Sequence, residues 1–127
     1  MDSAHPAKVL VADDEPHLLR LVKFRLVREG YDVITATDGE AALEAARRAL
    51  PDLCVLDVMM PKLSGFEVLR LMREDEHLKD VRVIMLTARA QDADVDAGFS
   101  LGADDYISKP FSPHELRVRV AAHLDRR

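Results

Sequence analysis

The chain has 127 residues, of which 48% are hydrophobic, which suits one compact domain with a core and leaves little room for a second. It carries 23 acidic and 18 basic residues, and this net charge of −5 disfavours a nucleic-acid-binding surface, which would need a basic stripe. The single cysteine, Cys54, excludes an intrachain disulfide, and neither a signal peptide nor an apolar run of membrane-spanning length is evident. We expect a single cytoplasmic domain over residues 1–127, with its core at about 7–124.

Five short apolar runs alternate with five longer stretches whose apolar residues recur at helical spacing. In chain order, the sequence predicts a strand at 9–12 and a helix at 18–26, a strand at 31–36 and a helix at 41–49, a strand at 53–56 and a helix at 66–72, a strand at 81–86 and a helix at 91–101, and a strand at 105–108 and a helix at 113–124. Gly30 ends the first helix, and Pro51 prevents the second from continuing. Ser112, followed by Pro113 and Glu115, is typical of a capped helix start.

The predicted strands are apolar on both faces, which favours a buried parallel sheet covered by helices. Their alternation with helices predicts an α/β fold, an open sheet with helices on both sides. In such a sheet ligands bind outside the carboxyl ends of the strands, so the residues just after each apolar run are the informative ones. Cys54 lies inside an apolar run, which favours a buried and inert thiol.

Polar side chains follow four of the five predicted strands. They are Asp13, Asp14 and Glu15 after the first strand, Asp57 after the third, Thr87 after the fourth and Lys109 after the fifth. Clustered carboxylates repel one another, and a hard divalent cation such as Mg²⁺, which prefers oxygen ligands, relieves that repulsion. An aspartate there can act as a nucleophile and form an aspartyl phosphate, while an ammonium and a hydroxyl group bind the phosphoryl oxygens.

Four stretches of the chain resemble the receiver domain of bacterial response regulators, the CheY-like family, over about residues 7–124. They are Val9 to Glu15, Leu56 to Gly65, Leu86 to Ala88 and Gly102 to Phe111. The resemblance implies a doubly wound, flavodoxin-like α/β fold with five helices and a five-stranded parallel sheet in the order 2-1-3-4-5.

The resemblance also implies a role for each matching residue of the site. Asp57 would accept the phosphoryl group, and Lys109 would bind it. Mg²⁺, or Mn²⁺, would be held by Asp13, Asp14, Asp57 and the backbone carbonyl of Met59.

Further residues would report or regulate the phosphorylated state. The resemblance implies that Thr87 and Tyr106 form a switch pair, and that Met59 and Arg89 tune the rate of dephosphorylation. It also implies a cis peptide bond at Lys109–Pro110, which a bond preceding proline tolerates.

Partners follow from the same resemblance. A histidine kinase or a histidine phosphotransfer protein would supply the phosphoryl group. The face formed by residues 91–101, 105–108 and 113–124 would pass the signal to a downstream effector protein or domain. The chain would be a monomer or a phosphorylation-dependent dimer, without direct contact to nucleic acid and without insertion into a membrane.

The family's DNA-binding subclass usually dimerises through that same face. Asp105 and Arg119 match its charge pattern, but Val95 and Ser100 stand where it has a basic and an acidic residue. The sequence therefore does not assign the chain to that subclass.

Two other functions remain open at this stage. The chain could be a hydrolase with an aspartate nucleophile, although Met59 stands where such enzymes place a second acid. It could also be a pseudo-receiver that interacts with partners independently of phosphate. Taken singly, Asp13 and Asp14 could be a helix-start pair, and Lys109 a solvated charge.

Overall fold

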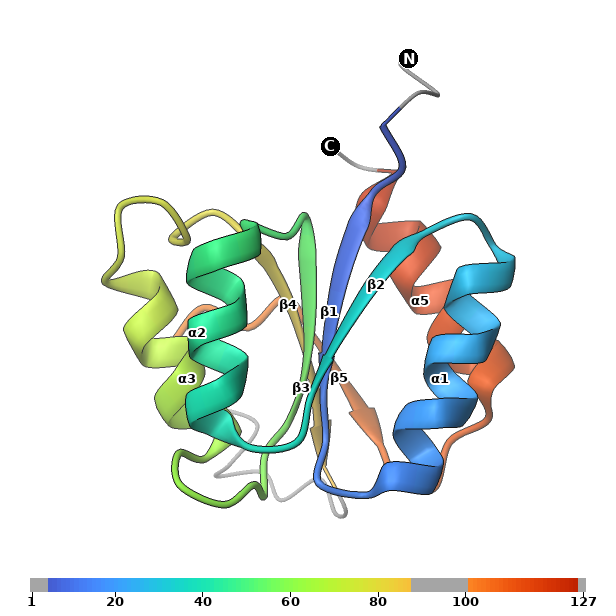
Figure 1. The fold of residues 1–127 in the computed structure, drawn as a ribbon, viewed down its shortest axis with the longest axis horizontal. Helices are drawn as coiled ribbons and strands as arrows, with labels where there is room; N and C mark the ends of the chain where they lie inside the picture. Colours follow the sequence, from blue (N-terminus) through green and yellow to red (C-terminus); the bar gives the residue numbers. More distant parts are fainter. Residues whose placement is uncertain (1–4, 88–100, 126–127) are drawn as a thin grey trace.

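The computed structural model of the chain describes residues 5–87 and 101–125. The elements, in order, are β1 (Lys8–Ala12), α1 (Pro16–Arg28), β2 (Asp32–Ala36), α2 (Gly39–Ala49), β3 (Leu53–Asp57), α3 (Gly65–Arg73), β4 (Arg82–Thr87), β5 (Asp105–Ser108) and α5 (Pro113–Leu124). The strands form one parallel sheet in the order β2-β1-β3-β4-β5, as predicted. Helices α2 and α3 cover one face of this sheet, and α1 and α5 cover the other (Figure 1).

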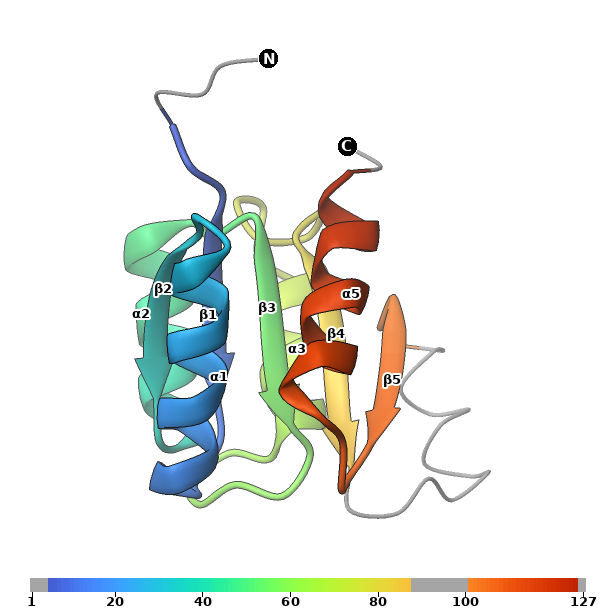
Figure 2. The same ribbon diagram turned by 90° about the vertical axis from the view of Figure 1, so that its right-hand side faces the viewer.

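The predicted strands agree with the observed ones to within one residue at each end. Burial on both faces holds for β1, β3 and β4, the three inner strands. The edge strands β2 and β5, visible at the two sides of the sheet in Figure 2, are partly exposed, because each has only one neighbouring strand.

Alternate residues of each inner strand point into two separate cores. Leu10 and Met85 pack with α2 and α3, whereas Val11 and Ile84 pack with α1 and α5. Cys54 lies in the first core, so the prediction of a buried thiol is confirmed, and burial raises its pKa to about 12.

Four of the five predicted helices are present, and their starts follow from local side-chain chemistry. Ser112 accepts a hydrogen bond from the Glu115 amide, as predicted for α5. Helix α2 begins two residues before the predicted start because Asp38 caps it. Ser64 and Glu67 form a reciprocal capping box that starts α3.

The predicted helix at 91–101 falls almost wholly outside the described residues. Leu101, its last residue, lies in a turn. Arg89, Val95 and Ser100 also lie outside the described residues, so the predictions that involve them stay predictions.

Helix α3 begins directly against the end of β3. The Gly65 amide donates a hydrogen bond to the Val58 carbonyl over 2.9 Å. A Cβ atom at Gly65 would lie 2.3 Å from the carbonyl oxygen of Asp57 and 2.8 Å from the side chain of Met85. Only glycine fits at this contact.

The amino edge of the sheet is held by carboxylates that each find a donor. Asp52 accepts from the Lys8 amide at 2.8 Å, and Asp104 accepts from the Val83 amide at 2.8 Å. Asp105 lies 2.8 Å from Arg119 and 3.0 Å from His123. Burial alone would raise the pKa of Asp105, but the hydrogen bonds from His123 and Arg119 hold it below its usual value.

Arg73, in the last turn of α3, ties that edge together. Its guanidinium donates to the carbonyl oxygen of Gly102 at 2.7 Å and to that of Lys79 at 3.2 Å. It also lies 3.4 Å from Asp104. One side chain therefore joins α3 to the segments that precede β4 and β5.

No helix within residues 5–87 and 101–125 is long and apolar enough to cross a membrane.

Candidate functional site

Three aspartates meet at the carboxyl edge of the sheet, opposite the edge held by Arg73. Asp13 and Asp14 follow β1, and Asp57 is the last residue of β3. One oxygen from each of the three carboxylates lies within 4.8 Å of the others. The sheet register produces this meeting, because β1 and β3 are hydrogen-bonded neighbours that run in parallel.

Asp13 is almost completely buried and is held from several sides. Its amide donates to the carbonyl of Ala36 over 3.1 Å, and its Oδ1 accepts from the Glu15 amide over 2.9 Å. Its Oδ2 lies 2.8 Å from Nζ of Lys109. Asp14, the next residue, is exposed. The pair thus presents one fixed and one solvent-facing carboxylate.

Asp57 is also buried, with an exposed fraction of 4%. Its Oδ1 accepts from the Met59 amide over 3.3 Å, and Nζ of Lys109 lies 3.3 Å from its Oδ2. Burial, together with the charge of Asp13, raises its pKa to about 6, against the opposing effect of Lys109. The acid at the end of β3 is therefore not an ordinary turn residue.

Lys109 brings the only ammonium group that contacts this cluster among the described residues. It lies 2.8 Å from Asp13, 3.3 Å from Asp57 and 3.5 Å from Glu15. Burial disfavours its charge, but the carboxylates of Asp13 and Asp57 hold its pKa above the usual value. The interpretation of Lys109 as a solvated charge is wrong, since its side chain is only 15% exposed.

Thr87 ends β4 beside this cluster and is buried. Its carbonyl accepts from the Lys109 amide over 2.7 Å, and the peptide bond from Lys109 to Pro110 is cis, as predicted. Tyr106 lies on β5 and packs, half-buried, against the core shared with α2 and α3. Met59 is 71% exposed just beyond Asp57.

The cluster fits a hard divalent cation. Asp13, Asp14 and Asp57 offer carboxylate oxygens, which Mg²⁺ and Mn²⁺ prefer, and Lys109 neutralises only one of these three charges. Two of the three carboxylates are buried, where uncompensated charge is costly. The donor set is therefore consistent with a divalent metal site.

Two contacts of the site were not predicted from the sequence. The sequence places Glu15 among the acids that follow β1, but it does not predict the contact of Glu15 with Lys109, which depends on how α1 begins. The close approach of Gly65 to the Asp57 carbonyl was also missed. The Ser64–Gly65 pair before a helix was its only signal in the sequence.

Comparison with known proteins gives a consistent result. The family model for the response regulator receiver domain matches residues 9–121. The chain is 50% identical over 119 residues to the alkaline phosphatase synthesis transcriptional regulatory protein PhoP of Bacillus subtilis, covering 94% of this chain and 49% of PhoP. It is 49% identical to the probable transcriptional regulator ycf27 of Guillardia theta, over 94% of this chain and 46% of that protein. The chain thus spans about half the length of the curated relatives it matches.

Solved structures agree. The CheX–CheY–BeF3–Mg²⁺ complex from Borrelia burgdorferi has a chain with a TM-score of 0.89 and 30% identity, covering 97% of this chain and 92% of that chain. The response regulator DrrB of Thermotoga maritima, an OmpR/PhoB homologue, gives a TM-score of 0.86 at 37% identity, over 95% of this chain and 54% of that chain. The fold, the acidic pocket with its lysine and the family match agree, and the chain belongs to the family of response regulator receiver domains.

Proposed function

We propose that Asp57 accepts a phosphoryl group from a phosphohistidine, and that the chain acts as a phosphorylation-dependent signalling switch. The observation that carries this proposal is the position of Lys109, whose ammonium lies 2.8 Å from Asp13 and 3.3 Å from Asp57. A half-buried cation beside a buried carboxylate supplies the charge needed when phosphoryl oxygens arrive. Family membership supports a histidine kinase or a histidine phosphotransfer protein as the donor.

In the transfer, a carboxylate oxygen of Asp57 forms the new bond to phosphorus while the bond between phosphorus and the donor's imidazole nitrogen breaks. The imidazole leaves with that electron pair. Lys109 then binds a phosphoryl oxygen, and the amide of Met59, which donates to Asp57 Oδ1, keeps the carboxylate oriented. The acceptor carboxylate and its counter-charge are thus already in place before the donor arrives.

Asp13, Asp14 and Asp57 would hold Mg²⁺ or Mn²⁺, together with the backbone carbonyl of Met59. When bound, the cation would supply positive charge against the phosphoryl oxygens. Asp13 contributes a fixed oxygen because its other contacts orient it, and Asp14 contributes one that solvent reaches.

Thr87 and Tyr106 would transmit the phosphorylated state. Thr87 lies on β4, and its carbonyl accepts a hydrogen bond from the Lys109 amide. A movement of Lys109 toward the phosphoryl group would therefore also move the end of β4. In the register of the sheet, Tyr106 of β5 is paired with Met85 of β4. A change at Thr87 would therefore reach β5, which is part of the predicted output face.

The proposal is tested by incubating the protein with Mg²⁺ and acetyl phosphate and measuring its intact mass. We expect one added phosphate in the wild type, none in Asp57→Asn, and none when EDTA replaces Mg²⁺. Asp105→Asn is the matched control, because it removes a half-buried acid from the opposite edge of the sheet and should label normally. Equal labelling of Asp57→Asn, or no labelling of the wild type, contradicts the proposal.

A second measurement, the turnover of a phosphomonoester, helps to decide between the proposal and the alternatives. Rapid turnover of a phosphomonoester would support a hydrolase, but the position two residues after Asp57 holds Met59, which cannot act as a general acid. Labelling of the wild type disfavours a pseudo-receiver.

A proposal about output follows from the relatives. Their names as transcriptional regulators support a role for this chain as the receiver of a longer transcriptional regulator, with any DNA contact made by another part. The net charge of −5 is consistent with that division. Sequencing the gene downstream of the codon for Arg127 tests this: a DNA-binding segment is expected, and an immediate stop codon contradicts it.

A further inference from the structure

Two guanidinium groups and an imidazole meet where α1 packs beside α5, on the face of the sheet seen at the right of Figure 1. We call Arg25, His114 and Arg117 the seam cluster. The Nδ1 atom of His114 accepts from Arg25 at 3.4 Å and from Arg117 at 3.1 Å. A guanidinium group can only donate, so both arginines direct N–H groups at the same imidazole nitrogen.

The charge of the seam cluster is incompletely balanced. Among the described residues, its ion pair is with Glu29, whose carboxylate lies 3.6 Å from Arg117. The Nε atoms of Arg25 and Arg117 are buried and find no hydrogen-bond partner within the described part of the chain. A buried donor of this kind is costly unless a partner arrives.

Another arginine of the same helix makes the imbalance plain. Arg119, two residues after Arg117, lies 2.8 Å from Asp105, which also pairs with His123 at 3.0 Å. There the arginine and the histidine share a carboxylate. In the seam cluster the two arginines share a histidine instead of a carboxylate.

We propose that the seam cluster is a binding site for a doubly charged oxyanion, the phosphate group of a small molecule or a free phosphate, held by Arg25, Arg117 and protonated His114. With Glu29 ionised and His114 protonated, the cluster's excess is two positive charges, which one dianion neutralises. Guanidinium groups bind oxyanions through parallel N–H donors, and two of them contact the same imidazole nitrogen here. Binding replaces the contacts between the guanidinium groups and the imidazole, and makes His114 a third donor.

Sulfate is the best first probe, because it keeps two charges across the range in which histidine titrates. The His114 ring signals are followed by NMR during a sulfate titration, with EDTA present and chloride holding the ionic strength constant. His114→Gln assigns the signals. We expect a shift of the His114 signals that saturates as sulfate is added.

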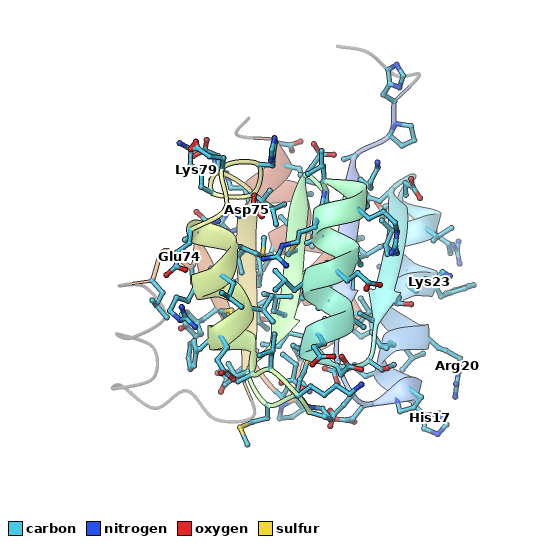
Figure 3. The ribbon with its side chains drawn as sticks, turned by 60° about the vertical axis from the view of Figure 1, so that its left-hand side comes forward. His17, Arg20, Lys23, Glu74, Asp75 and Lys79 are labelled. Atoms are coloured by element: carbon cyan, nitrogen blue, oxygen red, sulfur yellow. The ribbon has the colours of Figure 1, made fainter. Side chains whose placement is uncertain are left out.

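Substitutions locate the site. Arg25→Ala and Arg117→Ala should each weaken sulfate binding by about tenfold or more, which is the loss of a charge-assisted pair. The matched control is Arg20→Ala: Arg20 also contacts a histidine, His17, at 2.7 Å, but both point away from the fold, as does Lys23 (Figure 3). This control should change the affinity by less than about twofold.

Clear outcomes would overturn the proposal. The proposal is wrong if the shift does not saturate, if chloride reproduces the shift, or if Arg117→Ala binds sulfate with unchanged affinity. Far-UV circular dichroism checks that the variants fold, and Arg117→Lys, which keeps the charge but not the fork, gives the decision if Arg117→Ala does not fold. A phosphomonoester that binds more tightly than inorganic phosphate identifies a small phosphorylated molecule, and equal binding identifies the free anion. The proposal does not depend on phosphorylation of Asp57.

Discussion

The two edges of the sheet use the same residue type for opposite purposes. At the amino edge, Asp104 and Asp105 each face an amide, a guanidinium or an imidazole, and the pKa of Asp105 lies below its usual value. At the carboxyl edge, Asp13 and Asp57 share one ammonium, that of Lys109, and the pKa of Asp57 is raised to about 6. Carboxylates whose charge is balanced by neighbouring donors stabilise the fold, whereas carboxylates whose charge is not balanced are suited to bind a cation or accept a phosphoryl group.

The largest effect should come from removing the arginine of the amino edge. Arg73→Ala removes the guanidinium donor from the carbonyls of Gly102 and Lys79 and from the carboxylate of Asp104, so we expect a loss of about 2–3 kcal/mol of unfolding free energy. Urea denaturation measures it. Arg70→Ala is the control on the same helix. Among the described residues Arg70 makes only an exposed ion pair, with Glu74, so its removal should cost under about 0.5 kcal/mol. Equal losses of unfolding free energy in Arg73→Ala and Arg70→Ala would show that the contacts of Arg73 do not stabilise the amino edge.

At the carboxyl edge we expect a substitution to raise the unfolding free energy. Without divalent cations, Asp57→Asn should raise the unfolding free energy by about 2 kcal/mol near neutral pH, because it removes a buried charge beside Asp13. The folded-state pKa of about 6 lies above the usual 3.8, so wild-type stability falls as pH rises between these values. The difference between the two proteins should therefore grow through this interval and vanish below it. A destabilised Asp57→Asn at neutral pH would contradict the comparison.

A smaller loss is expected for Asp105→Asn. Near neutral pH it removes the pairs with Arg119 and His123, and we expect a cost of about 1 kcal/mol. Because the folded-state pKa of Asp105 is lowered, its contribution is complete above the usual value of 3.8 and is lost as pH falls through the folded-state value. Urea denaturation at neutral and acidic pH measures this, with the exposed Asp32→Asn as the control. A cost that persists at the lowest pH would point to packing instead of charge.

The smallest effect tests whether a cation completes the carboxyl edge. Mg²⁺ at one to a few times its dissociation constant should stabilise the wild type by about 0.4–1 kcal/mol, and Asp57→Asn or Asp13→Asn by less. Thermal unfolding with Mg²⁺ or with EDTA measures it. The same stabilisation in Asp13→Asn would mean that the ion binds elsewhere.

Much of the fold could be predicted because the signals are local. The inner strands β1, β3 and β4 are continuous apolar runs, and α5 begins at Ser112 as its sequence indicates. The edges were harder, since the partial exposure of β2 and β5 depends on strand order and not on composition.

The residues of the site could be predicted from local sequence patterns, whereas several long-range contacts elsewhere in the molecule could not. Asp13, Asp57 and Lys109 each follow an apolar run, and parallel pairing places such residues together. The contacts of Arg73 with Gly102 and of Arg25 with His114 join residues far apart in the chain. They depend on how helices pack and on side-chain conformation, which no local pattern records.

The contact of Gly65 with the backbone of Asp57 has a consequence for the freedom of this sequence to vary. Any side chain at position 65 would push the start of α3 away from the acceptor strand, since its first carbon would lie 2.3 Å from the Asp57 carbonyl oxygen. In a library that samples every amino acid at each position, selection for folding alone should leave glycine at position 65. At Asp57 the same selection should accept asparagine, so only a screen for phosphorylation would restore the aspartate. The neighbouring ends of β3 and α3 are thus constrained by two separate requirements, one steric and one chemical.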